Sequence, residues 1–135
     1  MIDRDELTAA LESVLVERPE VELALLFGSR ARGGERAGSD VDVAVEGEGV
    51  DRLALARDLS AVAGLEVEVV DLRRAGYPLL KALLRDSVVL HQGRPHAEAE
   101  FRTRAILQTE TDRPWYERMR DGYLHHLAEA ADGRS

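Results

Sequence analysis

Short apolar runs alternate with longer amphipathic segments along this chain. Residues 21–27 (VELALLF) are apolar and end at Gly28, which predicts a short buried strand. Residues 40–46 (DVDVAVE) and 65–72 (LEVEVVDL) alternate acidic with apolar residues, as in strands that have one charged and one apolar face. The run at 88–93 (VVLHQG) is typical of a short edge strand. The pattern therefore predicts four strands.

Apolar residues at helical spacing predict helices before and between these strands. Residues 3–18 open with Asp3 and Glu6 in the spacing of a capping box. The segment 51–64 opens with Asp51, an aspartate suited to the N-cap position. The residues expected to face the core are Leu7, Leu11, Val14 and Leu15 in the first helix, and Leu55, Leu59 and Val62 in the second.

The last part of the chain is predicted to be mostly helical. Pro78 suits the first turn of a helix over 77–87. From about residue 96 the pattern is helical again, with a break expected near Pro114, because proline lacks an amide hydrogen and clashes with the preceding turn. After this break, apolar and aromatic residues recur at helical spacing and are interpreted as packing residues or partner-facing anchors: Trp115, Tyr116, Met119, Tyr123 and Leu127.

The order of these elements predicts an α/β fold with a mixed central sheet flanked by helices. With 135 residues, the chain is expected to form one domain over 1–135, with a C-terminal helical segment from about 96.

Composition narrows the classes of function. A net charge of -8 argues against direct nucleic-acid binding, because contacts to phosphates need a cationic face, and a basic protein is a more natural partner. No apolar run approaches the roughly 18 residues of a membrane span. Residues 1–20 carry acidic groups where a signal peptide needs basic ones, and the chain has no cysteine, so we expect a cytoplasmic protein without membrane contact.

Two aspartates stand out on the second predicted strand. Asp40 and Asp42 are two residues apart, so their carboxylates leave the same face and can share a hard divalent cation. Carboxylates this close repel one another, and a bound cation keeps both ionised. A solvated strand face is the alternative, but the preceding loop favours the metal site.

That loop has the composition of an anion cradle. Gly28 and Ser29 directly follow a buried strand, where a tight turn can point backbone amides and the serine hydroxyl at an anion. Arg30, Arg32 and Arg36 can donate to phosphate oxygens, or can instead pair with neighbouring acids. A phosphate cradle that faces metal-binding carboxylates predicts a site for a nucleoside triphosphate.

The spacing of these residues resembles that of a known family. Gly28-Ser29, ten further residues and then Asp40-x-Asp42 are similar to the signature of the polymerase-beta-like nucleotidyltransferases, and FGSRARG with SDVDV resembles its minimal members. The likeness continues through 67–93 and the C-terminal helix, and so covers most of the chain. Within the family, it is greatest to the antitoxins of HEPN/MNT toxin–antitoxin systems.

This resemblance implies a fold, a reaction and a partner. The fold would be that of the polymerase-beta-like nucleotidyltransferases, and the reaction would move AMP from ATP, with Mg²⁺, to a tyrosine of a HEPN ribonuclease toxin, which is thereby neutralised. Asp40 and Asp42 would hold Mg²⁺. Glu68 would take the place of the family's third carboxylate, usually an aspartate, where it would join the metal and favour deprotonation of the attacking hydroxyl. Asp71 is a poor replacement because strand alternation puts it on the opposite face. The nucleotide would be bound by Gly28, Ser29, Arg30 and Arg32.

Two other functions remain compatible with the sequence. A non-catalytic antitoxin could neutralise the ribonuclease by direct binding. A nucleotidyltransferase could instead modify a small hydroxylated compound such as an aminoglycoside, although the sequence has no evident extra domain to enclose one.

Overall fold

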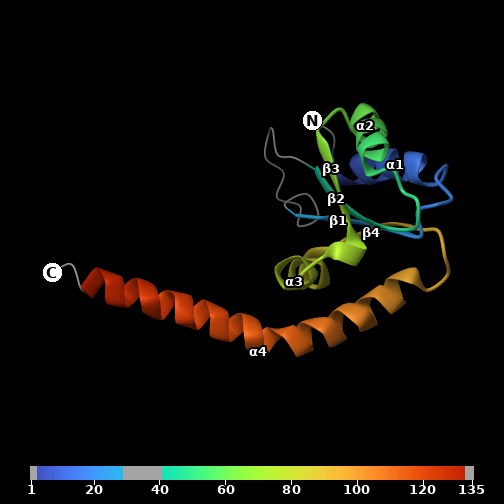
Figure 1. Cartoon of the computed structure of the whole chain (residues 1–135). Coiled ribbons are helices and arrows are strands. Elements are labelled where there is room, and N and C mark those ends of the chain that lie inside the picture. The colour runs from blue at the N-terminus through green and yellow to red at the C-terminus, as the bar shows by residue number, and fades with distance from the viewer. Residues whose placement is uncertain (1–2, 29–40, 133–135) are drawn as a thin grey trace.

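A four-stranded sheet lies at the centre of the molecule, with helices packed on both faces (Figure 1). The computed structural model describes residues 3–28 and 41–132. In chain order the elements are α1 (Arg4–Leu15), β1 (Leu23–Phe27), β2 (Val41–Glu46), α2 (Arg52–Ala63), β3 (Val67–Asp71), the short 3-10 helix η1 (Leu72–Arg74), α3 (Tyr77–Asp86), β4 (Val88–Gln92) and α4 (Ala97–Asp132).

The sheet is mixed, as the order of the elements predicts. Its strand order is β3-β2-β1-β4. β1 runs antiparallel to both β2 and β4, whereas β2 and β3 are parallel. β4 is an edge strand, which confirms that prediction, and β3 forms the other edge.

The two faces of the sheet carry separate apolar layers. α1 and α2 cover one face, and α3 with the first half of α4 covers the other (Figure 1). Because successive strand residues point to opposite faces, Val41, Val43 and Val45 pack under α1 and α2, while Ala44 packs under α3 and α4. Asp42 alternates with these valines and therefore belongs to the α3/α4 face.

Local capping signals begin the first two helices as the sequence predicts. The Asp3 side chain accepts a hydrogen bond from the Glu6 backbone amide at 2.8 Å, and Asp51 accepts one from the Ala54 amide at 3.1 Å. These bonds satisfy amides that have no partner inside the helix. Pro78 lies in the first turn of α3, where its missing amide hydrogen costs nothing.

One prediction about the core-facing residues of α2 is wrong. Leu55 and Leu59 are buried as expected, but Val62 is 43% exposed and Ala63 is buried in its place. Four residues make slightly more than one turn, so the buried stripe moves around the helix and reaches Ala63 by the last turn. Gly64 then ends the helix in a left-handed conformation, with φ of 67°.

The predicted break near Pro114 is also wrong, because α4 continues through it for 36 residues. Proline removes the hydrogen bond to the carbonyl of residue 110, but both residues are exposed, so water can solvate that carbonyl. The helix bends in its middle instead of ending (Figure 1). Despite the length of α4, no helix in the described part of the chain is long and apolar enough to cross a membrane.

Candidate functional site

Two acidic side chains that the sequence singles out lie opposite each other on neighbouring strands. Asp42 of β2 and Glu68 of β3 are register partners in the parallel pair, and neighbouring strands lie about 4.8 Å apart. Register partners on parallel strands point to the same face, which here is the face covered by α3 and α4. Asp42 is half-buried and Glu68 is exposed. A carboxylate fixed by the sheet thus lies beside one that solvent and substrates can reach.

Gly28, directly after β1, approaches the Asp42 carboxylate closely. Phe27, the last residue of β1, is the register partner of Asp42, and Gly28 follows with φ of 83°. A Cβ atom added at Gly28 would lie 2.8 Å from the Asp42 Oδ2 atom, closer than real Cβ contacts come. Glycine is therefore required here for its backbone conformation and for the space that the carboxylate occupies.

Asp71 lies away from the pair, as strand alternation predicts. It is the register partner of Val45, at the far end of β3 from Val67. Its side chain accepts a hydrogen bond from the Arg73 backbone amide at 3.0 Å and so caps η1. Asp71 therefore stabilises η1, and Glu68 is the β3 carboxylate that lies beside Asp42.

Several predicted site residues fall outside the described part of the chain: Ser29, Arg30, Arg32, Arg36 and Asp40. Within residues 3–28 and 41–132, no cluster of three or more metal-ligating side chains occurs. The described part of the candidate site is therefore the pair Asp42 and Glu68 together with Gly28.

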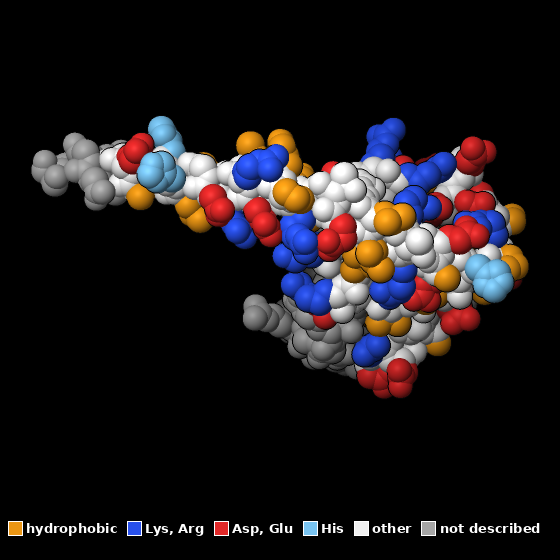
Figure 2. Space-filling model, turned by 90° about the horizontal axis from the view of Figure 1, so that it is seen from below, with side chains coloured by type: hydrophobic (Ala, Val, Ile, Leu, Met, Phe, Trp, Pro, Cys, Tyr) orange, Lys and Arg blue, Asp and Glu red, His pale blue; other side chains and the backbone are white. Residues whose placement is uncertain are grey.

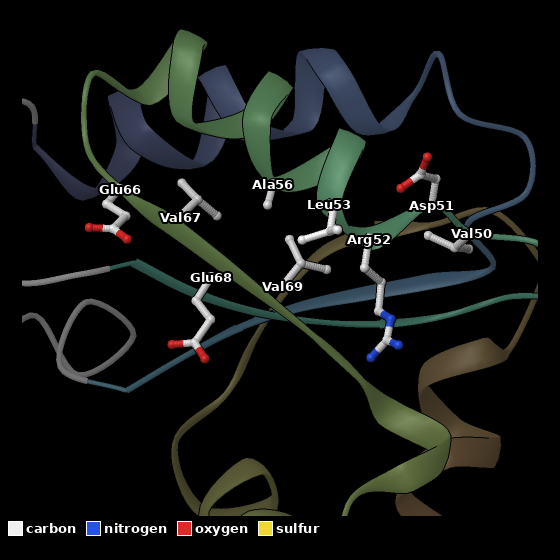
Figure 3. Close-up of a pocket in the computed structure, with 9 residues that line it drawn as sticks. All are labelled: Val50, Asp51, Arg52, Leu53, Ala56, Glu66, Val67, Glu68 and Val69. Carbon is white, nitrogen blue, oxygen red and sulfur yellow. The ribbon is translucent and has the colours of Figure 1, made fainter.

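A pocket of about 830 Å³ opens at the outer edge of β3, beside Glu68. Its walls are residues 66–69 on the strand side, and residues 50–53 with Ala56 at the start of α2. Figure 3 shows Val67 and Val69 directed toward α2, with Arg52 on this same side of the strand, while Glu68 extends to the other side. The pocket combines an apolar wall with groups of both charge signs, which suits a ligand with both apolar and charged parts.

Arg52 is a residue of this pocket that the sequence reasoning missed. It directly follows the N-cap Asp51, which could have drawn attention to it, but only the folded chain brings it near β3.

An ion pair that the sequence did not predict joins the far end of the same sheet face to α4. Arg104 donates to Glu46 at 2.6 Å, and Glu46 is only 8% exposed. This ion pair fixes α4 against the end of β2.

Comparisons with known proteins match both the sequence and the fold. The family model described as polymerase beta, nucleotidyltransferase, matches residues 9–95. No curated protein matches the sequence significantly.

Solved structures with the same fold include toxin–antitoxin proteins. One, a toxin–antitoxin crystallised with AMP-PNP, superimposes with a TM-score of 0.76 at 23% identity, over 87% of this chain and 98% of that one. A second comes from the complex of a tri-AMPylated Shewanella oneidensis HEPN toxin with its MNT antitoxin, with a TM-score of 0.68, 21% identity and coverage of 87% and 98%.

A third solved structure, described as a minimal nucleotidyltransferase, is 31% identical to this chain. It covers 64% of this chain and 95% of its own, with a TM-score of 0.55. The family match spans β1, β2 and β3, the strands that carry Gly28, Asp42 and Glu68. With this match over more than half of its length, the chain belongs to the polymerase beta nucleotidyltransferase family.

Proposed function

We propose that this protein transfers AMP from ATP to a tyrosine of a partner HEPN ribonuclease toxin and thereby neutralises it. The observation that carries the proposal is the register pair of Asp42 and Glu68 beside the Gly28 turn. Support also comes from the fold shared with an antitoxin whose toxin is tri-AMPylated.

The donor atoms at the site fit a divalent cation. Carboxylate oxygens are the ligands that Mg²⁺ prefers, and Asp42 and Glu68 present two carboxylates on one face. Asp40, outside the described residues, completes the proposed set. When bound, Mg²⁺ would neutralise charge on the triphosphate and on the departing pyrophosphate.

The phosphate groups would be held by the loop that follows β1. The positive φ of Gly28 and its lack of a side chain let the backbone come close to Asp42. Ser29, Arg30 and Arg32 are proposed to donate hydrogen bonds to the phosphate oxygens. The nucleotide would then lie between this loop and the carboxylates.

Glu68 is proposed to act on the acceptor. The tyrosine oxygen attacks the α-phosphorus of ATP and forms a new P–O bond, while the bond to pyrophosphate breaks. The hydroxyl proton passes to the Glu68 carboxylate, which is exposed and borders the pocket at the edge of β3. The products are the tyrosine-linked AMP and pyrophosphate.

A test separates this reaction from neutralisation by direct binding. The partner ribonuclease is incubated with ATP, Mg²⁺ and a small molar fraction of this protein, then isolated, weighed by intact mass spectrometry and assayed. We expect one or more added AMP units on a tyrosine and loss of RNase activity in the isolated partner. The Asp40→Ala, Asp42→Ala double variant should produce neither effect.

Direct binding predicts a different outcome. A covering antitoxin must be present mole for mole, because the ribonuclease regains activity when the complex dissociates. A partner that keeps its mass and is silenced only by an equimolar amount of this protein would contradict the transfer reaction.

A further inference from the structure

Four large apolar side chains form an exposed row on the second half of α4. Trp115, Met119, Tyr123 and Leu127 are spaced four residues apart, and we name this row the α4 stripe. Their exposed fractions are 50%, 57%, 64% and 46%. Contiguous exposed apolar surface is uncommon on soluble proteins and marks sites of interaction.

The α4 stripe continues the face by which the first half of α4 packs onto the sheet. Phe101, Ala105 and Thr109 are buried on that face. Met119, Tyr123 and Leu127 follow them by eighteen residues in each case, which is about five turns of an α-helix. The same face therefore continues from the first half of α4 into the second, but only its first half is covered by the rest of the described chain.

The body of the protein ends where the exposed row begins. The Tyr116 ring stacks on Tyr77 of α3, with centroids 4.6 Å apart and planes at 20°. Beyond this contact, every side chain described from 119 to 130 is exposed. Figure 1 shows this half of α4 projecting away from the sheet.

The projecting half lies on the same side of the sheet as the candidate site. α4 covers the face to which Asp42 and Glu68 belong, and not the face covered by α1 and α2. A protein seated on the α4 stripe would therefore approach the molecule from the carboxylate side.

We infer that the α4 stripe is the docking surface for the protein that receives the nucleotidyl group, an inference that rests on the proposed function. The four apolar side chains of the stripe recur every fourth residue along one helix face, which suits insertion of this helix into an apolar groove between helices of the acceptor. Docking there would hold the acceptor next to Glu68 through contacts remote from the reacting atoms.

A second copy of this chain fits the stripe less well. The four half-exposed side chains offer on the order of 400 Å², about half of the roughly 800 Å² that each partner contributes to a standard interface. A pair of helices alone would bury little more, and two copies with a charge of -8 each repel one another. An acceptor that also reaches the sheet face buries additional surface.

Charged side chains beside the α4 stripe form ion pairs with other residues of the same helix. Arg113 lies 4.0 Å from Glu117, and Arg120 lies 3.3 Å from Asp121. Figure 2 shows charged side chains of both signs along the projecting half. Apolar contact, and not net charge, would therefore supply the affinity, so binding should depend only weakly on salt.

The test compares two aspartate substitutions on the same helix. Tyr123 belongs to the stripe and is 64% exposed, whereas Leu107 lies on another face and is 65% exposed. We expect Tyr123→Asp to weaken calorimetric binding of the partner HEPN ribonuclease at least about tenfold. KM for the ribonuclease should rise in step, while kcat stays within about twofold. Leu107→Asp should leave both values close to wild type.

The possible outcomes separate docking from catalysis. If wild type and Tyr123→Asp had the same affinity for the partner and the same KM, the inference of a docking surface would be overturned, whether or not AMP is transferred. Tyr123-dependent binding to a partner that gains no AMP would contradict the proposed function and leave the docking surface standing. A wild-type dimer in sedimentation that Tyr123→Asp dissociates, with unchanged partner affinity, would assign the stripe to a second copy and overturn the inference.

Discussion

At the scale of single residues, the proposed chemistry depends on which acid of β3 shares a face with Asp42. Glu68 is its register partner, whereas Asp71 pairs with Val45 and caps η1. We expect Glu68→Gln to lower the rate of transfer by at least about 100-fold, because a general base typically contributes that much or more. Nucleotide binding should change less than the rate, because Asp40 and Asp42, the proposed Mg²⁺ ligands that face the triphosphate, stay in place.

Asp71→Asn is the matched control for this prediction. It also removes one carboxylate charge from β3, but at the other end and on the other face of the strand. Single-turnover transfer rates and calorimetric ATP affinities of the two variants provide the comparison. If Asp71→Asn slowed transfer more than Glu68→Gln, the roles of the two acids would have to be exchanged.

At the scale of elements, the start of α2 matters because this turn also borders the pocket beside β3. The Asp51 side chain satisfies the Ala54 amide, and replacing such a cap by alanine costs about 1 kcal/mol. We expect Asp51→Ala to reduce the free energy of unfolding in urea by about this amount. Glu12→Ala removes an exposed acidic group from within α1 and should change stability by less than about 0.5 kcal/mol. Equal losses in the two variants would indicate a general charge effect.

At the scale of the whole molecule, the structure separates a packed body from a projecting helical segment. Every side chain described from 119 to 130 is exposed, so this segment contributes little buried surface. We expect deletion of residues 119–135 to change the free energy of unfolding by less than about 1 kcal/mol. Leu11→Ala, at a position that is 0% exposed, should cost about 2 to 5 kcal/mol in the same urea titration. A comparable loss on deletion would show that the segment stabilises the body.

Much of the fold and part of the site could be predicted because they depend on neighbours in the chain. The alternation of acids and valines in β2 and β3 indicated both strands and their charged faces. Asp3 and Asp51 indicated where two helices begin, and both accept the expected hydrogen bonds. Gly28 was expected at a tight turn and has a positive φ. Periodicity and capping are local properties, so the sequence alone determines them.

The tertiary structure decided what depends on long-range packing. It made Asp42 the register partner of Glu68, brought Gly28 against the Asp42 carboxylate, and buried Ala63 where Val62 was expected. In the folded chain α4 also continues past Pro114, because the helix is exposed there and water can solvate the carbonyl that loses its hydrogen bond. Strand order, register and the covering of a helix face follow from contacts between residues far apart in sequence. For that reason the apolar spacing of α4 was visible in the sequence, while its exposed second half on the carboxylate side of the sheet emerged only from the folded chain.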